Sequence, residues 1–131
     1  MSKQVKVIIQ NEEGKYLLVK RADNEKKEHF GNWECPGGKV RKGETFEEAA
    51  IREVKEEVNL DIKIIKVVKK ISKDDKIVAI VFLGKPLSKK VILSKEHSDY
   101  GWFTYEELKS LEPVTYKDFF LELIELAKST P

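Results

Sequence analysis

The stretch GKVRKGETFEEAAIREVKEEVNL, residues 38–60, carries the signals for a loop, a helix and a helix stop. The Thr45 hydroxyl is placed to cap the helix, and Glu48, three residues on, completes a capping box. Apolar residues at spacings of three and four predict the stripe that faces the core, at Ile51, Val54 and Val58. Asn59 tolerates the left-handed conformation and is the predicted stop.

The predicted helix carries three carboxylates near its C-terminal end, at Glu53, Glu56 and Glu57. Each faces the negative end of the helix dipole at a cost of about 0.3–1 kcal/mol, and like charges at these spacings repel one another. A divalent cation would remove both penalties, because Mg²⁺ or Mn²⁺ prefers carboxylate oxygens and also takes phosphate oxygens. The cluster therefore predicts a metal-dependent enzyme acting on phosphates, and a solvated acidic surface is the alternative.

Size and charge limit the classes of function. At 131 residues and 15.2 kDa, the chain fits one domain with one core. Lys+Arg 25 against Asp+Glu 23 gives a formal charge of +2, so no stable nucleic-acid complex is expected. Cys35 is the only cysteine and no apolar run of about 18 residues occurs, which excludes an intramolecular disulfide and predicts a cytoplasmic protein without a membrane span.

Seven further segments have the composition and alternation of strands: 4–10, 15–21, 33–35, 60–70, 77–83, 91–93 and 102–103. Residues 11–14 predict a hairpin joining the first two, residues 22–31 an exposed loop, and residues 36–38 a turn. The alternation slips at Ile64, which predicts a bulge, and the continuous apolar run 77–83 predicts a strand buried on both faces.

Two more helices are predicted, over 105–111 and 116–128. Their capping signatures are Thr104 with Glu107 and Thr115 with Asp118. Strands precede and follow the central helix, so the predicted architecture is a mixed sheet covered by helices.

The spacing within residues 38–60 resembles the signature of the Nudix hydrolases, which cleave nucleoside diphosphates linked to a further group. Gly38 is followed after five residues by Glu44, and after seven more by REVKEEVNL, so every defining position matches except the last glycine, which is Asn59. The likeness continues in GNWECPGGKV and EHSDYGWFTYEEL. It implies an α+β fold, an αβα sandwich, as a single domain over residues 1–131, with the box as loop, helix and loop.

The resemblance also implies roles for residues of the box. It places metal ligands at the Gly38 carbonyl and at the carboxylates of Glu53, Glu56 and Glu57. Arg52 matches the arginine that orients a catalytic carboxylate, and Glu44 is expected to brace the loop; a plain surface ion pair is the alternative. The general base is either Glu53 or Glu96, and for Glu96 an exposed loop acid is the alternative.

Further residues are candidates for substrate contact. Arg21 and Lys39 match basic residues that meet phosphates in the family, unless they are solvated strand ends. Aromatic candidates for stacking on a base, with core packing as the alternative, are Trp33, Phe30, Phe82 and Tyr100. His29 and His97 are expected at the surface or behind the ligands rather than on the metal.

The leading interpretation is hydrolysis of a phosphoanhydride in a nucleoside triphosphate, with Mg²⁺ or Mn²⁺, to monophosphate and pyrophosphate. Oxidised or non-standard nucleotides are expected substrates, although Thr115, Tyr116 and Asp118 offer no asparagine for base recognition. The alternatives are a dinucleoside polyphosphate or ADP-ribose pyrophosphatase, and a non-catalytic nucleotide- or RNA-binding module. A purely structural adaptor is the weakest option, because it leaves the clustered acids unexplained. A monomer or homodimer is expected.

Overall fold

The computed structural model describes residues 2–22 and 31–129, and its strands form two sheets. The four-stranded sheet has the order β4-β1-β6-β5, from Gly37–Lys39, Gln4–Ile9, Lys76–Pro86 and Ile62–Lys73. The three-stranded sheet has the order β3-β2-β7, from Trp33–Glu34, Tyr16–Arg21 and His97–Phe103. The β1–β6 pair is parallel and the other pairs are antiparallel.

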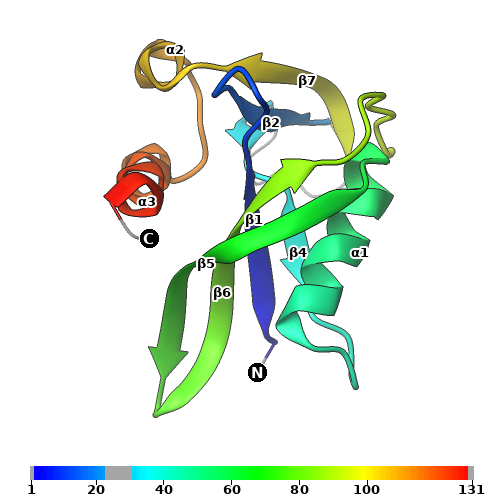
Figure 1. Cartoon of the computed structure of the whole chain (residues 1–131), viewed down its shortest axis with the longest axis vertical. Coiled ribbons are helices and arrows are strands. Elements are labelled where there is room, and N and C mark those ends of the chain that lie inside the picture. Colours follow the sequence, from blue (N-terminus) through cyan, green and yellow to red (C-terminus); the bar gives the residue numbers. More distant parts are fainter. Residues whose placement is uncertain (1, 23–30, 130–131) are drawn as a thin grey trace.

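Helices cover both sides of these strands (Figure 1). The helix α1, Phe46–Val58, lies on one side, and α2, Tyr105–Ser110, and α3, Lys117–Ser129, lie on the other. This arrangement confirms the predicted α+β class with a mixed sheet between helices.

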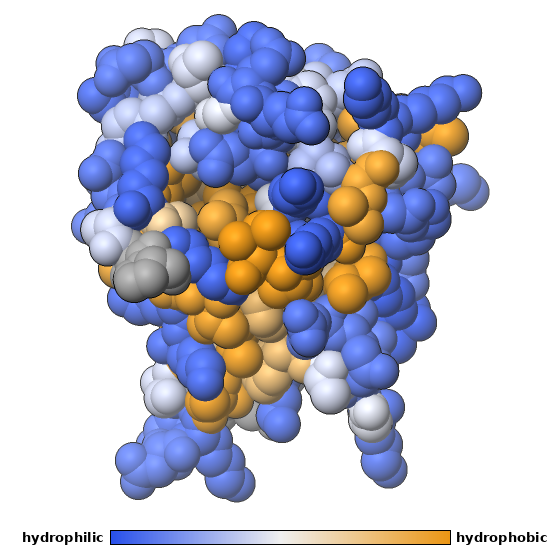
Figure 2. Space-filling model, in the orientation of Figure 1, coloured by the Kyte–Doolittle hydropathy of each residue, from blue (hydrophilic) through white to orange (hydrophobic). Residues whose placement is uncertain are grey.

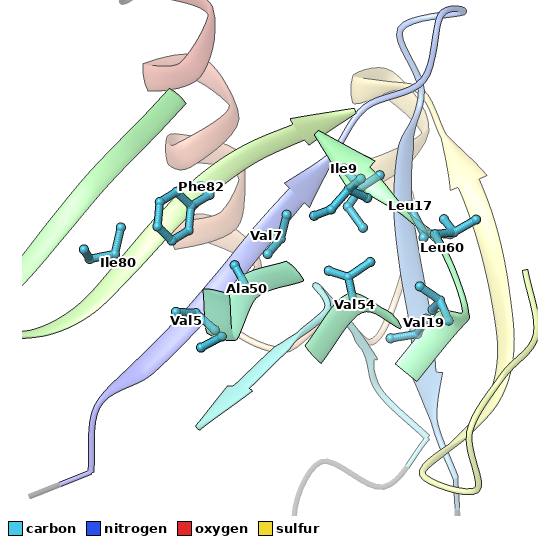
Figure 3. Close-up of a cluster of buried hydrophobic side chains, with 13 residues drawn as sticks. Val5, Val7, Ile9, Leu17, Val19, Ala50, Val54, Leu60, Ile80 and Phe82 are labelled. Carbon is cyan, nitrogen blue, oxygen red and sulfur yellow. The ribbon is translucent and has the colours of Figure 1, made fainter. Parts of the chain in front are cut away.

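Alternation along β1 divides the core into two clusters. Val5, Val7 and Ile9 face α1, and Ile8 faces the other way, toward α3. Figure 3 shows the α1 side, where Val54 of the helix meets side chains from β1, β2 and β6. Because side chains of successive strand residues point to opposite faces, one strand supports both helical layers.

The local signals around α1 are confirmed. Thr45 caps the helix and forms the predicted capping box with Glu48, and Asn59 ends it with a φ of 61°. The predicted stripe is correct at Val54 and Val58 and wrong at Ile51, whose side chain is exposed. Burial falls instead on the small residues Ala49 and Ala50, which let the helix approach the sheet closely.

The predicted hairpin pairing of the first two strands is wrong. The turn forms, with Asn11 N–H donating to the Lys15 carbonyl and Gly14 N–H to the Asn11 carbonyl. Apart from a single bridge between Gln10 and Tyr16, however, β1 and β2 separate into different sheets. Each strand instead pairs with a strand distant in the sequence, β1 with β6 and β2 with β7.

Three other expectations need correction. The predicted turn at 36–38 is largely β4, because Gly38 pairs with Val5 of β1. Residues 91–93 are not a strand. The apolar run of β6 is buried at Ile80 to Phe82, but Ile77 lies 36% exposed near its start.

The two helices predicted near the C-terminus are present, but only the first has the predicted cap. A capping box precedes α2, as predicted from Thr104 and Glu107. At α3, however, Tyr116 with a φ of 50° immediately precedes the helix. The Thr115 hydroxyl instead accepts a hydrogen bond from the Asn32 side chain at 3.3 Å.

The predicted bulge of β5 is present, as a register shift between Ile64 and Lys66. The predicted loop 22–31 lies outside the described residues, except at its two ends.

The strand β5 forms one edge of the four-stranded sheet and is rich in lysine. In the view of Figure 2, apolar side chains gather over the middle of the molecule, where β5 and β6 cross between the helices. Exposed apolar residues on these strands are Ile65, Val67 and Ile77. Charged lysines beside them discourage another chain from pairing with the open edge.

The corrected stripe of α1 can be tested by truncating one buried and one exposed β-branched residue. Val54→Ala removes apolar contacts from a side chain with 0% exposure and should lower the free energy of unfolding by about 2 kcal/mol. Ile51→Ala, on the same helix, should cost less than half as much because its side chain is 41% exposed. Urea denaturation measures both, and equal losses would contradict the assigned face.

Candidate active site

Arg52 is the centre of an ion-pair network on α1. Its Nε donates to Glu44 Oε2 at 2.6 Å and its Nη2 to Glu44 Oε1 at 2.9 Å. Its Nη1 donates to Glu53 at 2.9 Å and lies 3.3 Å from both oxygens of Glu56. Its Nη2 also reaches the Lys39 carbonyl at 2.9 Å. Arg52 therefore fastens β4 and the following loop to the helix, which is more than a solvated surface pair.

The loop carboxylate in this network is held ionised. Hydrogen bonds from Arg52 and from the Arg41 backbone N–H, the latter 2.9 Å from Oε1, lower the pKa of Glu44 to about 2. The Arg41 side chain also contacts Glu56 at 3.2 Å. Two arginines thus compensate acids on one side of the helix.

Glu57 has a different environment from the other two helix acids. Its side chain is buried, with 6% exposure for the residue, and its Oε1 accepts a hydrogen bond from the Gly37 N–H at 2.9 Å. Burial raises the pKa of Glu57 to about 8, assisted by the nearby charges of Glu53, Glu96 and Glu34. Since no cation compensates this carboxylate among the described ion pairs, it favours either a proton or a bound metal.

The glycine at position 38 is explained by its contact with Glu53. A Cβ on Gly38 would lie 2.5 Å from the carboxyl carbon of Glu53, so any other residue at position 38 would displace the Glu53 carboxylate. The backbone of β4 therefore runs directly against a predicted metal-binding carboxylate. Carboxylate and carbonyl oxygens are donors that fit a hard divalent cation, and joint binding by Gly38 and Glu53 stays a prediction.

A second group of potential ligands forms where the chain enters β7. Ligand atoms of Glu57, Glu96 and His97 all lie within 4.8 Å of one another. Within residues 2–22 and 31–129, this is the one set of three His, Cys, Asp or Glu residues that converges so closely. The structure thus brings Glu57 to Glu96, whereas Glu53 and Glu56 face Arg52; their joint metal binding stays a prediction.

Behind this group lies a buried network on the three-stranded sheet. Glu34 Oε2 is 2.9 Å from His97 Nε2, and Arg21 Nη1 lies 3.2 and 3.3 Å from the two oxygens of Glu34. Burial opposes ionisation of Glu34, but the His97 hydrogen bond and the charges of Lys6 and Arg21 outweigh it and lower the pKa of this carboxyl. Sequence reasoning did not single out Glu34, because its partners come from distant strands.

The predicted phosphate-binding residues occupy different settings. Arg21 forms an ion pair with Glu34. Its Nε is buried and has no hydrogen-bond partner in the described part of the chain. Lys39 is exposed at the end of β4, beside the carbonyl that Arg52 binds.

The predicted aromatic residues do not gather at one place. Trp33 packs edge-on against Phe103, with ring centroids 5.3 Å apart, and Phe82 is buried in the α1-side core. Tyr100 is 41% exposed on β7. Phe30 and His29 lie outside the described residues. Core packing thus accounts for Phe82, and the substrate roles of the others stay predictions.

A pocket of about 250 Å³ opens between the four-stranded sheet and α3. Its walls are mainly apolar, and its aromatic lining comes from Tyr116, Phe119 and Phe120. Glu34 also lines it, so the pocket adjoins the network that leads to His97 and the acidic group. The aromatic residues at the start of α3 are visible in the sequence, but packing of the helix against the core would account for them equally well.

The family model for the NUDIX domain matches residues 2–123. This chain belongs to the Nudix family. The nucleoside triphosphatase NudI of Salmonella agona is 31% identical over 115 residues, which cover 77% of this chain and 80% of that protein. A putative 8-oxo-dGTP diphosphatase of Bacillus subtilis is 49% identical over 51 residues, covering 39% and 30%.

Solved structures of Nudix proteins share the fold. The MutT protein of Methanosarcina mazei superposes with a TM-score of 0.78 at 28% identity, covering 98% of this chain and 96% of that one. The prediction of a Nudix hydrolase from residues 38–60 is therefore confirmed. No helix in the described part of this Nudix chain is long and apolar enough to cross a membrane.

The raised pKa of Glu57 predicts how stability depends on pH without metal. The native state holds this proton more tightly than the unfolded chain, whose carboxyl has the ordinary value of 4.5. The stabilising contribution is therefore fully present below 4.5 and is lost as pH rises through about 8. In EDTA, the free energy of unfolding of the wild type should fall over this range relative to that of Glu57→Gln. Parallel profiles in urea denaturation would contradict the assignment.

Proposed function

We propose that this Nudix hydrolase cleaves nucleoside triphosphates to the monophosphate and pyrophosphate, with a divalent cation. The observation that supports this most directly is the position of the apolar pocket. Through Glu34 and His97, the pocket adjoins Glu57 and Glu96, so an apolar base site and an acidic cation site share one wall. A nucleotide requires both kinds of site at a separation spanned by its sugar and phosphates.

The proposed cation ligands are the Gly38 carbonyl and the carboxylates of Glu53, Glu56, Glu57 and Glu96. A divalent cation bound there supplies neutralisation of phosphate oxygens and a lowered pKa for water. Mg²⁺ is the proposed physiological cation, with Mn²⁺ as the alternative. Arg52 holds Glu53 and Glu56 in place through its Nη1, and Glu44 in turn fixes Arg52 from the loop.

Glu53 is the first candidate for the carboxylate that accepts the proton of the attacking water. Its side chain is positioned from two sides, by Arg52 at 2.9 Å and by the close backbone of Gly38. A general base must be held within hydrogen-bond reach of the water, and this bracing supplies the needed precision. Glu96 is the second candidate because it lies close to Glu57 and is exposed.

The pocket supports a nucleoside as the group bound away from the phosphates. Tyr116 and Phe119 are exposed at its rim and provide faces on which a base can stack. Polar groups of the wall come from Gln4, Lys6, Glu34 and Thr115. Relatives of this chain carry the names nucleoside triphosphatase and 8-oxo-dGTP diphosphatase, which supports a triphosphate and makes oxidised or non-standard bases part of the proposal.

The cellular setting follows the same proposal. The near-balanced charge of +2 and the single cysteine support a cytoplasmic enzyme that acts on free nucleotides rather than on nucleic acid. A monomer or homodimer remains the proposed assembly.

Replacing the box acids separately tests the catalytic assignment. Glu53→Gln and Glu56→Gln should each lower turnover of a nucleoside triphosphate by about two orders of magnitude or more, because each removes a charged group from the cation site. Glu47→Gln, an exposed acid in the first turn of the same helix, is the matched control and should retain wild-type turnover.

The measurement is chromatographic separation of products from a nucleotide panel with Mg²⁺ and with Mn²⁺. The panel includes ADP-ribose and dinucleoside polyphosphates as the alternative substrates. Thermal melting of each variant shows that it is folded. Nucleotide binding without release of phosphate or pyrophosphate from any member would replace the proposed hydrolase with a binding module.

A further inference from the structure

The imidazole of His97 is buried with one nitrogen unused. Its side chain is 1% exposed, and its Nε2 lies 2.9 Å from Glu34 Oε2. Its Nδ1 is buried and has no hydrogen-bond partner in the described part of the chain. An ionised carboxylate only accepts hydrogen bonds, so Nε2 carries the proton and Nδ1 presents a lone pair. Buried polar atoms are nearly always satisfied, and this one therefore calls for a ligand.

The imidazole of His97 also lies close to two further carboxylates, Glu57 and Glu96. The ligand atoms of Glu57, Glu96 and His97 lie within 4.8 Å of one another. With Glu57 and Glu96 both ionised, as metal binding requires, the two carboxylates and the imidazole lone pair are all acceptors and cannot hydrogen-bond directly to each other. A water molecule has two protons for three acceptors, whereas one cation satisfies all three.

The spacing is close to that of a formed metal site. Ligands at about 2.0–2.2 Å from one ion lie at most about 4.4 Å apart, when they are on opposite sides of it. Three ligands around one ion cannot all be opposite one another, so each of these ligand atoms would move by up to about 0.6 Å to reach a common ion. Glu57 is already fixed by the Gly37 N–H, so the exposed Glu96 side chain is the group free to adjust.

We propose that His97 Nδ1, Glu57 and Glu96 form a mixed nitrogen–oxygen subsite that binds Mn²⁺ more tightly than Mg²⁺. Metal-binding histidines commonly donate their other ring N–H to a carboxylate, and Glu34, itself held by Arg21, occupies that place. Imidazole nitrogen favours transition metals, whereas Mg²⁺ demands oxygen ligands and retains its waters.

This assignment revises the expectation that His97 stands behind the ligands. It rests on the proposed function only for the role of the bound ion in hydrolysis. Binding of the metal can be tested without nucleotide. The proposed nitrogen ligand also differs from the ligands predicted within residues 38–60, because His97 belongs to β7 and the predicted carboxylates belong to α1.

The test uses the full chain with Mn²⁺ alone, without nucleotide. Electron spin-echo envelope modulation detects coupling between bound Mn²⁺ and an imidazole ¹⁴N. The wild type should show this coupling, and His97→Gln should abolish it and weaken Mn²⁺ binding at least tenfold, with a smaller change for Mg²⁺. The chain has two histidines, so His29→Gln is the matched control and should keep the coupling.

A second variant acts through the ring rather than on the metal. Glu34→Gln removes the carboxylate behind His97 and should weaken Mn²⁺ binding by roughly 10–100-fold, the range found when such supporting groups are lost. It keeps the test open if His97→Gln fails to fold. The proposal is overturned if the wild type shows no ¹⁴N coupling, if His97→Gln retains it, or if His29→Gln loses it.

Parallel assays of nucleotide hydrolysis with Mg²⁺ separate this inference from the proposed function. Hydrolysis together with an oxygen-only Mn²⁺ spectrum would overturn the subsite and leave the hydrolase standing. Nitrogen coupling without hydrolysis of any nucleotide would support the subsite and overturn the proposed hydrolase.

Discussion

Burial of the Glu57 carboxylate is the constraint around which the site is organised. Removing an ionised carboxylate from water costs several kcal/mol unless it is paired. Glu57 lies near the negative end of its own helix and accepts a hydrogen bond from a neutral donor, the Gly37 N–H. The fold tolerates this because the apolar cluster on the α1 side holds the helix, and pairing with β1 holds β4, independently of the carboxylate. The burial of this acid supports the proposed cation site.

Arg52 limits the charge repulsion that this arrangement creates. By binding Glu53 and Glu56, it leaves Glu57 as the buried acid without a cationic partner among the described ion pairs. Its bidentate contact with Glu44 fixes the guanidinium plane, so the same residue positions the loop, the edge strand β4 and two carboxylates. The position of the loop and the proposed cation site therefore both depend on the Arg52 side chain.

The separation of β1 and β2 into two sheets creates the remaining half of the site. The three-stranded sheet carries Arg21, Glu34 and His97 on neighbouring strands, which builds the buried network behind the acids. The four-stranded sheet and α3 enclose the apolar pocket, and Glu34 borders both regions. A continuous hairpin-based sheet would not have placed these groups along one wall.

The sequence by itself determined the helix of the box, its cap at Thr45, its stop at Asn59 and the family, because these depend on residues close together in the chain. Only the tertiary structure decided that Ile51 is exposed and that Glu34 meets His97 across 63 residues. Local spacing cannot report which strands pair or which carboxylate loses its water. Those outcomes follow from burial in the assembled core, where distant segments compete for the same partners.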